Sequence, residues 1–150
     1  MALTRDAAEA GADAALVVTP YYFEHGPDAM ADYYRRVADA SPVPVYLYSV
    51  PAFTGRALAP ETVGRVADHP NVAGMKDSSG DMAAFKRILA RTPDDFDLLV
   101  GSGGVYAEAL ALGGRAASSA SPTSCPNSPR PCTRPTTRPS RASATTRSSN

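Results

Sequence analysis

The sequence predicts an α/β fold of about four βα units, which we interpret as part of a (β/α)8 TIM barrel. Four short apolar runs are each followed by a turn and then by a stretch with helical periodicity. The first two runs are continuous rather than alternating, as is typical of parallel strands covered on both faces. The expected strands cover residues 14–19, 44–49, 72–77 and 96–101.

Apolar residues recur at helical spacing after each expected strand. The expected helices cover residues 28–40, 61–68, 81–91 and 106–112. Pro60 precedes the second of them, and proline is favoured in the first turn of a helix. The first strand is followed by Pro20 to Phe23, where a nucleotide-binding sheet would have a Gly-rich phosphate turn. A barrel is therefore favoured over a doubly wound nucleotide-binding fold.

Charge and composition divide the chain into two expected segments. Residues 1–115, the expected partial barrel domain, carry ten basic and fifteen acidic residues, which gives a net charge of −5. Residues 116–150 carry five arginines, no acidic residue and no Val, Ile, Leu, Met, Phe, Tyr or Trp. A segment of this composition cannot bury a core, so we expect it to be disordered.

We interpret residues 116–150 as an out-of-frame reading of a barrel sequence. Reading the last base of each codon together with the first two bases of the next codon gives a shifted reading frame. Over residues 116–128 this frame permits an apolar strand followed by the start of a helix. The chain also opens inside a βα pattern, which indicates truncation at its start. The alternative, an arginine-rich arm for nucleic acid, is disfavoured because the segment lacks lysine and aromatic side chains. We therefore expect no nucleic-acid partner.

Several other classes of protein are disfavoured. No run approaches the ~18 apolar residues of a membrane span, and the N-terminus lacks an apolar signal region. We therefore expect a cytoplasmic protein without a membrane partner. Both cysteines, Cys125 and Cys132, lie in residues 116–150, so no disulfide framework holds the expected barrel domain. No spacing typical of metal ligands is present, and we expect neither a metal nor a cofactor.

Lys76 is the first candidate catalytic residue, because it lies near the C-terminal end of an otherwise apolar strand. Active sites of (β/α)8 barrels lie at that end of the strands. Burial disfavours the charged ammonium, and a neutral amine is a nucleophile. The alternative is a surface lysine in an ordinary ion pair, which the position at the strand end disfavours.

Tyrosines and small polar residues at the other strand ends complete the candidate site. Tyr48 ends the preceding strand and could relay a proton, although a core aromatic role fits its spacing equally well. Tyr46 faces the same side by alternation and is the competing choice. Tyr21 and Tyr22 end the first strand, where packing at a loop or subunit contact is the alternative. Small residues at the strand ends leave room for a substrate carboxylate. They are Ser78, Ser79, Gly101 and Ser102.

Three motifs carry a resemblance to a known superfamily. Val18–Tyr22 (VTPYY), Leu47–Pro51 (LYSVP) and Gly74–Ser78 (GMKDS) resemble, in order and spacing, the N-acetylneuraminate lyases and dihydrodipicolinate synthases. The resemblance implies a (β/α)8 barrel, usually a homotetramer, that binds pyruvate or a related 2-oxo acid as an imine.

The resemblance also implies roles for individual residues. Lys76 would form the imine and Tyr48 would shuttle protons. Tyr22 matches a tyrosine that reaches a neighbouring subunit's site in some members. Gly101 matches a glycine near the substrate, beside the candidate substrate-binding residue Ser78.

The loop after Tyr48 favours one branch of the superfamily. Ser49 replaces an asparagine typical of the synthases, and Phe53 stands where their arginine binds the carboxylate of the aldehyde substrate. No other fixed cation is evident in that loop. The motif resembles 4-hydroxy-2-oxoglutarate aldolase, a class I aldolase and carbon–carbon lyase that yields pyruvate and glyoxylate.

Two alternatives to that aldolase stay open. One is 4-hydroxy-tetrahydrodipicolinate synthase, and the other is a non-catalytic 2-oxo-acid-binding module on the same fold. The resemblance implies that three initial strands and the last strand are absent. We therefore expect the 150-residue chain itself to be inactive or barely folded, because part of a barrel leaves open edges and an open interior.

Overall fold

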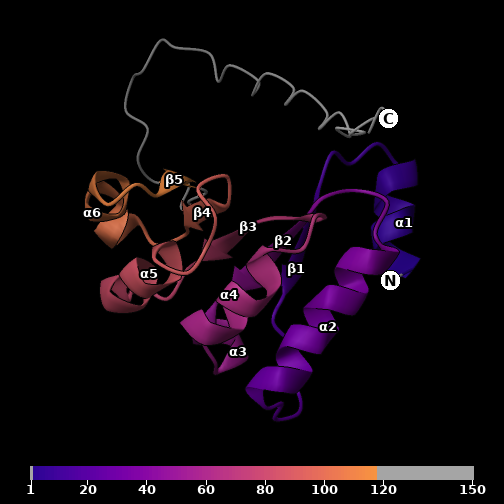
Figure 1. Ribbon diagram of the computed structural model, residues 1–150, viewed down its shortest axis with the longest axis horizontal. Coiled ribbons are helices and arrows are strands. Elements are labelled where there is room, and N and C mark those ends of the chain that lie inside the picture. The colour runs from indigo at the N-terminus through magenta and orange to yellow at the C-terminus, as the bar shows by residue number, and fades with distance from the viewer. Residues whose placement is uncertain (1, 118–150) are drawn as a thin grey trace, which may run out of the picture. The chain divides into compact units, whose positions relative to one another are not determined.

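The computed structural model describes residues 2–117 of the chain and shows five parallel strands in sequential order. Each strand pairs with the next along the chain, and the order of the sheet is β1-β2-β3-β4-β5 (Figure 1). The strands are β1 Ala15–Val18, β2 Val45–Ser49, β3 Val72–Asp77, β4 Asp97–Val100 and β5 Arg115–Ala117. This arrangement confirms a partial parallel α/β barrel.

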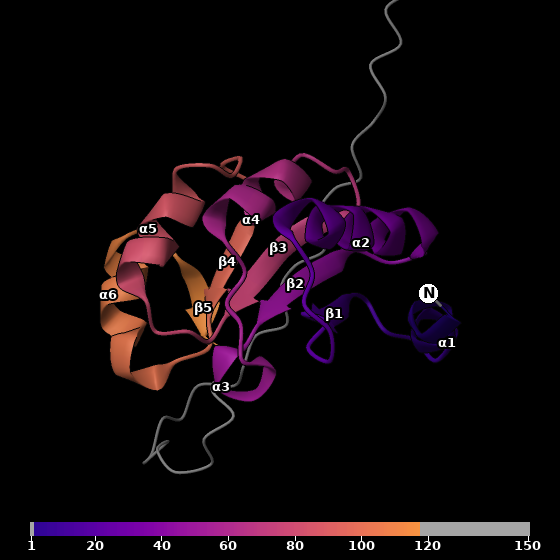
Figure 2. The same ribbon diagram turned by 90° about the horizontal axis from the view of Figure 1, so that it is seen from below.

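Helices connect the successive strands and cover one face of the sheet. Figure 2 shows α2, α4 and α5 on the same side of the strands. The helices are α1 Ala2–Glu9, α2 Pro27–Ala40, α3 Pro51–Thr54, α4 Pro60–Ala67, α5 Met82–Leu89 and α6 Tyr106–Ala111, and a 3-10 turn spans Gly103–Val105. Within residues 2–117 no helix has the length and apolar character needed to cross a membrane.

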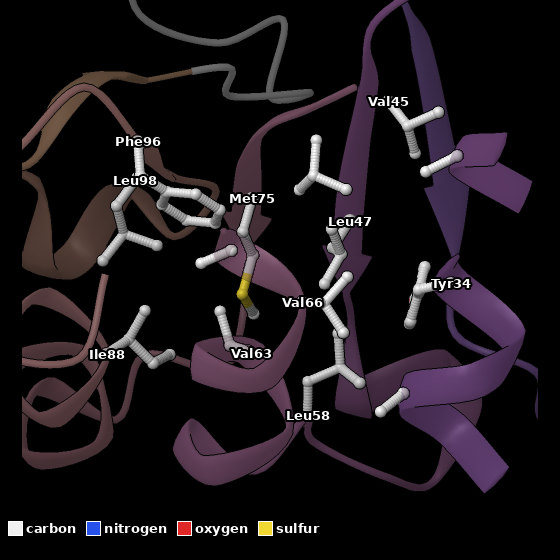
Figure 3. Packing of buried hydrophobic residues seen from close by; sticks show 14 of the residues in the cluster. Tyr34, Val45, Leu47, Leu58, Val63, Val66, Met75, Ile88, Phe96 and Leu98 are labelled. Carbon is white, nitrogen blue, oxygen red and sulfur yellow. The ribbon is translucent and has the colours of Figure 1, made fainter. Parts of the chain in front are cut away.

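The core lies between the sheet and these helices (Figure 3). Side chains from alternate strand positions meet the apolar stripes of α2, α4 and α5. The largest fully buried members include Leu47, Met75 and Leu98 from the strands and Tyr34, Val66 and Ile88 from the helices. This burial fixes which strand positions face the helices, and the residues between them therefore face the other side of the sheet.

That other side is only partly covered in the described residues. Leu16 and Val18 of β1 are 51% and 39% exposed. The continuous apolar runs led us to expect strands covered on both faces. The difference arises because, within residues 2–117, helices cover one face, while the opposite face is the one that lines the interior of a closed barrel.

Polar contacts at the helix ends hold the connections in place. Asp81 caps α5 by accepting hydrogen bonds from the backbone N–H groups of Ala83 and Ala84 at 2.9 and 3.0 Å. At the end of α2, the amide of Asn71 donates to the carbonyl oxygens of Ala38 and Ser41, each at 2.8 Å. The loop before β3 is thereby tied to the end of α2.

The short fifth strand continues the sheet two residues past position 115. Arg115 pairs with Leu99, and Ala117 pairs with Val100. Strand pairing uses backbone groups and does not require apolar side chains, so an Arg-Ala-Ala segment can continue the sheet. The rest of the segment expected to be disordered and out of frame, residues 118–150, lies outside the described residues.

Candidate active site

Lys76 lies near the C-terminal end of β3 on the face of the sheet away from the helices. Its neighbour Met75 belongs to the helix-covered core, and successive side chains of a strand point to opposite faces. Lys76 is only 8% exposed, and it belongs to none of the ion pairs found among residues 2–117. The described structure therefore does not support the alternative of a surface lysine in an ordinary ion pair.

Tyr48 is the closest aromatic partner of this lysine. The two residues are direct partners in the register between β2 and β3. The Lys76 Nζ lies 4.6 Å from the centroid of the Tyr48 ring, within the range of a cation–π contact. The structure thus places an amine and a phenol side by side at adjacent strand ends.

Tyr46, the competing tyrosine, is engaged elsewhere on the same face. It pairs with Gly74, two residues before Lys76, and its hydroxyl donates to Asp97 Oδ2 at 2.8 Å. A Cβ on Gly74 would lie 2.8 Å from both Tyr46 Cε1 and Asp97 Cβ, so the glycine makes room for this contact. Of the two tyrosines, Tyr48 is therefore the one beside Lys76.

Gly101 and Ser78 join the same group. The Gly101 N–H donates to the carbonyl oxygen of Asp77 at 2.6 Å, which holds the end of β4 against the end of β3. A Cβ on Gly101 would collide with Ser78 Oγ and lie 3.0 Å from Lys76 Cε. The structure therefore brings together four of the five predicted site residues, and a side chain at position 101 would displace Ser78 or Lys76.

Tyr22, the fifth predicted residue, is separate from this group. It lies in the loop after β1, is 84% exposed, and its ring contacts Phe23 edge to face at 4.8 Å between centroids. Phe53 in α3 is similarly exposed, at 86%. Both aromatic side chains are accessible at the loops that follow the strands.

Arg56 corrects the expectation that the loop after Tyr48 contains no other fixed cation. Its Nη2 donates to Glu24 Oε1 at 2.6 Å, so the loop after β2 is tied to the loop after β1. The Arg56 side chain is 29% exposed, whereas that of Glu24 is 92% exposed. Sequence reasoning missed this cation because its partner lies 32 residues away in the chain.

A buried carboxylate beside the site was also missed. Asp77 follows Lys76 and is 4% exposed. Its Oδ1 accepts a hydrogen bond from the Ser79 N–H at 3.1 Å, and its Oδ2 accepts one from the Ser79 hydroxyl at 2.8 Å. Burial raises the pKa of Asp77, while hydrogen bonds from Ser79 and Ser49 act in the opposite direction. The sequence signal that could have identified Asp77 is an acidic residue at the end of an otherwise apolar strand.

The arrangement is suited to carbonyl chemistry carried by side chains alone. A buried amine can add to a carbonyl carbon, and a neighbouring phenol can donate or accept the protons that move. Among the described residues, no group of three or more His, Cys, Asp or Glu side chains is placed to bind a metal ion.

The profile of the Dihydrodipicolinate synthetase family matches residues 1–145. The chain belongs to this family. Two curated relatives, from Bacillus velezensis and Bacillus subtilis, are 42% and 43% identical to it over 113 and 114 residues. Both are named 4-hydroxy-tetrahydrodipicolinate synthase, and each match covers 75% of this chain and 39% of the relative. The chain thus spans about two fifths of the length of these relatives.

Solved structures of the family have the same fold. Dihydrodipicolinate synthase DapA-2 of Bacillus anthracis is 33% identical, with a TM-score of 0.75 over 79% of this chain and 40% of that one. YagE of E. coli K12, solved in complex with pyruvate, is 34% identical with a TM-score of 0.74, over 79% of this chain and 41% of that one. The superfamily resemblance and the barrel class are therefore confirmed.

The names of the relatives bear on the finer expectation. They match the synthase alternative better than the 4-hydroxy-2-oxoglutarate aldolase that the loop after Tyr48 favoured. The family match also extends 30 residues past the expected domain boundary at 115.

Proposed function

We propose that the protein is a Schiff-base carbon–carbon lyase of pyruvate-type 2-oxo acids, with Lys76 as the amine that binds the substrate. The single observation that carries the proposal is the buried Lys76 Nζ, 4.6 Å from the centre of the Tyr48 ring.

The proposed chemistry starts with addition of the Lys76 amine to the 2-oxo carbon. The two protons of the amine pass to the 2-oxo oxygen, with the Tyr48 hydroxyl giving one proton and regaining another, and this oxygen leaves as water as the C=N bond of the imine forms. The Ser78 hydroxyl would donate to the substrate carboxylate, and the lack of a side chain at Gly101 leaves room for that hydroxyl beside Lys76. The imine then acts as an electron sink while a carbon–carbon bond forms or breaks at the neighbouring carbon.

For the second substrate we propose the aldehyde of the 4-hydroxy-tetrahydrodipicolinate synthase reaction, since the relatives carry that name. The sequence disfavoured this aldehyde because no cation for the aldehyde's carboxylate was evident in the loop after Tyr48. In the structure Arg56, which is paired with Glu24, supplies a cation in the loop after β2. The second candidate is cleavage of 4-hydroxy-2-oxoglutarate, which is favoured by Ser49 and by the exposed Phe53.

Trapping with borohydride tests the imine step without requiring turnover. The chain is incubated with pyruvate, reduced, and measured by intact-protein mass spectrometry with peptide mapping. We expect one reduced 2-oxo-acid adduct on Lys76 and none in Lys76→Arg, which keeps the charge but not a neutral amine. Pyruvate binding without any adduct would instead indicate a non-catalytic binding module.

The assembly and location are proposed together with the activity. We propose a homotetramer in the cytoplasm, with the exposed Tyr22 at a contact between subunits. One similar solved structure, 30% identical with a TM-score of 0.74 over 77% of this chain and 40% of that one, is described as the first monomeric dihydrodipicolinate synthase variant. Light scattering of the purified protein distinguishes the two states, and a monomer would contradict the proposal.

A further inference from the structure

The Asp77 carboxylate is the centre of a hydrogen-bond chain on the helix-covered face of the sheet. Ser79 donates to it from both its N–H and its hydroxyl, and the same hydroxyl accepts from the Asp81 N–H at 3.1 Å. Ser49 is the register partner of Asp77 on β2. The Ser49 hydroxyl oxygen accepts in turn from the Leu58 N–H at 3.2 Å.

This chain runs from the end of β3 to Asp81, the residue that caps α5. Both carboxylate oxygens of Asp77 accept a hydrogen bond, one from the Ser79 N–H and the other from the Ser79 hydroxyl. The Ser49 hydroxyl, at the paired end of β2, ties that strand to the loop before α4.

Backbone hydrogen bonds of Asp77 and Ser78 also hold the ends of the neighbouring strands. The Asp77 carbonyl accepts from the Gly101 N–H at 2.6 Å, and the Ser78 N–H donates to the Ser49 carbonyl at 2.9 Å. Lys76 therefore precedes a residue that is bound to the turn after β3 through its side chain and to the end of β4 through its backbone carbonyl. A small displacement of Asp77 would move the lysine relative to Tyr48 and Gly101.

A carboxylate is an unfavourable choice for a purely structural role at this position. Transfer of an ionisable group from water to a site that is 4% exposed opposes folding. An apolar side chain of similar volume would avoid that penalty, as replacements of buried charged groups in other proteins show. A buried acid at the residue next to the amine is therefore a candidate for placing that amine.

We propose that Asp77 is the positioning residue of the lysine site, and that its side-chain hydrogen bonds to Ser79 hold the end of β3 and the turn after it in the geometry needed for imine formation. The proposal deepens the function proposed above and rests on it. Asp77 does not touch the substrate in this account, because its side chain faces the helices while the lysine faces the opposite side of the sheet.

Asp77→Asn is the informative variant, since it keeps the size of the side chain but replaces one acceptor oxygen by a donor. The rate of borohydride-trapped adduct formation is measured against pyruvate concentration. We expect the maximal rate to fall on the order of tenfold to a hundredfold, as displaced reacting groups produce. The half-saturating pyruvate concentration and the thermal midpoint should change little. Asp97→Asn makes the same chemical change near the other end of the sheet and should leave the maximal rate intact.

Two results would overturn the proposal. One is an unchanged maximal rate in Asp77→Asn, and the other is an equal fall in both variants accompanied by equal loss of stability. If the unaltered chain forms no adduct, the proposed function fails by itself. Amide hydrogen exchange then decides the positioning role: at least roughly tenfold faster exchange at Ser79 and Gly101 in Asp77→Asn supports it, and unchanged exchange refutes it.

Discussion

The Lys76 amine lies over the face of the Tyr48 ring, with 4.6 Å between Nζ and the ring centroid. The two residues occupy paired positions of β3 and β2. Because the register fixes these two residues opposite each other, their contact does not depend on a flexible loop. The contact therefore allows variants at the site to be designed with little change to the fold.

Replacement of Tyr48 by phenylalanine separates the ring from its hydroxyl. Tyr48→Phe keeps the ring over Lys76 but removes the proton donor, so we expect imine trapping to slow by about 10²- to 10⁴-fold. The measurement is the initial rate of adduct formation with pyruvate. Tyr46→Phe is the matched control: it loses the bond to Asp97, should reduce the unfolding free energy by about 1 kcal/mol, and should trap at the normal rate. Equal slowing in both variants would contradict a special role for Tyr48.

Gly101 provides a steric test of the site. Gly101→Ala places a methyl group against Ser78 Oγ and Lys76 Cε, and we expect a destabilisation of about 1–3 kcal/mol together with loss of trapping. Urea unfolding and the trapping assay measure the two effects. Gly103→Ala is the control, because a Cβ there meets nothing within 4 Å. Normal trapping by Gly101→Ala would show that the glycine is not needed beside the lysine.

The buried Asp77 predicts a direction for the pH dependence of stability. Its folded pKa is raised above the ordinary value of 3.8, with burial as the main cause and the nearby Asp81 acting in the same direction. Between those two pKa values the folded state binds more protons than the unfolded state, so this contribution to stability is lost as the pH rises. In urea unfolding at a series of pH values, Asp77→Asn should therefore gain stability relative to the unaltered chain with rising pH. A difference that shrinks with rising pH would refute the assignment.

Phe53 tests the choice of the second substrate. Phe53→Arg should change the unfolding free energy by less than about 0.5 kcal/mol, because the side chain is 86% exposed. If an arginine at this position binds a carboxylate, the variant should increase the yield of carbon–carbon adducts with aldehydes that carry a carboxylate. Mass spectrometry after sequential addition of pyruvate and aldehyde measures that yield. Phe23→Arg, at another exposed aromatic residue of these loops, should show no such gain.

Sequence patterns predicted the regular elements well, because periodicity reports which face of an element is buried. The four apolar runs became β1 to β4, and the four helical patterns became α2, α4, α5 and α6. The short helix α3 and the strand β5 were not predicted. Their four and three residues are too few to show a period, and β5 forms through backbone pairing with β4.

The candidate site was predictable in its residue types but not in its connections. Lys76, Tyr48, Ser78 and Gly101 were identified from their positions at strand ends, and the structure brings them together. The roles of Asp77 and Arg56 depend on surroundings that only the fold creates, namely the burial of the acid and the pairing of the arginine with Glu24. Such pairs leave no periodic signal in the sequence.

The sequential order of the strands has a consequence for the way the chain acquires its structure. Within residues 2–117 every strand pairs only with its neighbours in the sequence, so each newly made βα unit of this part can dock onto the preceding one. During synthesis from the N-terminus, β2 is complete before β3 emerges, and β4 follows later. The contact between Tyr48 and Lys76 can therefore form early, and Gly101 at the end of β4 joins these residues afterwards.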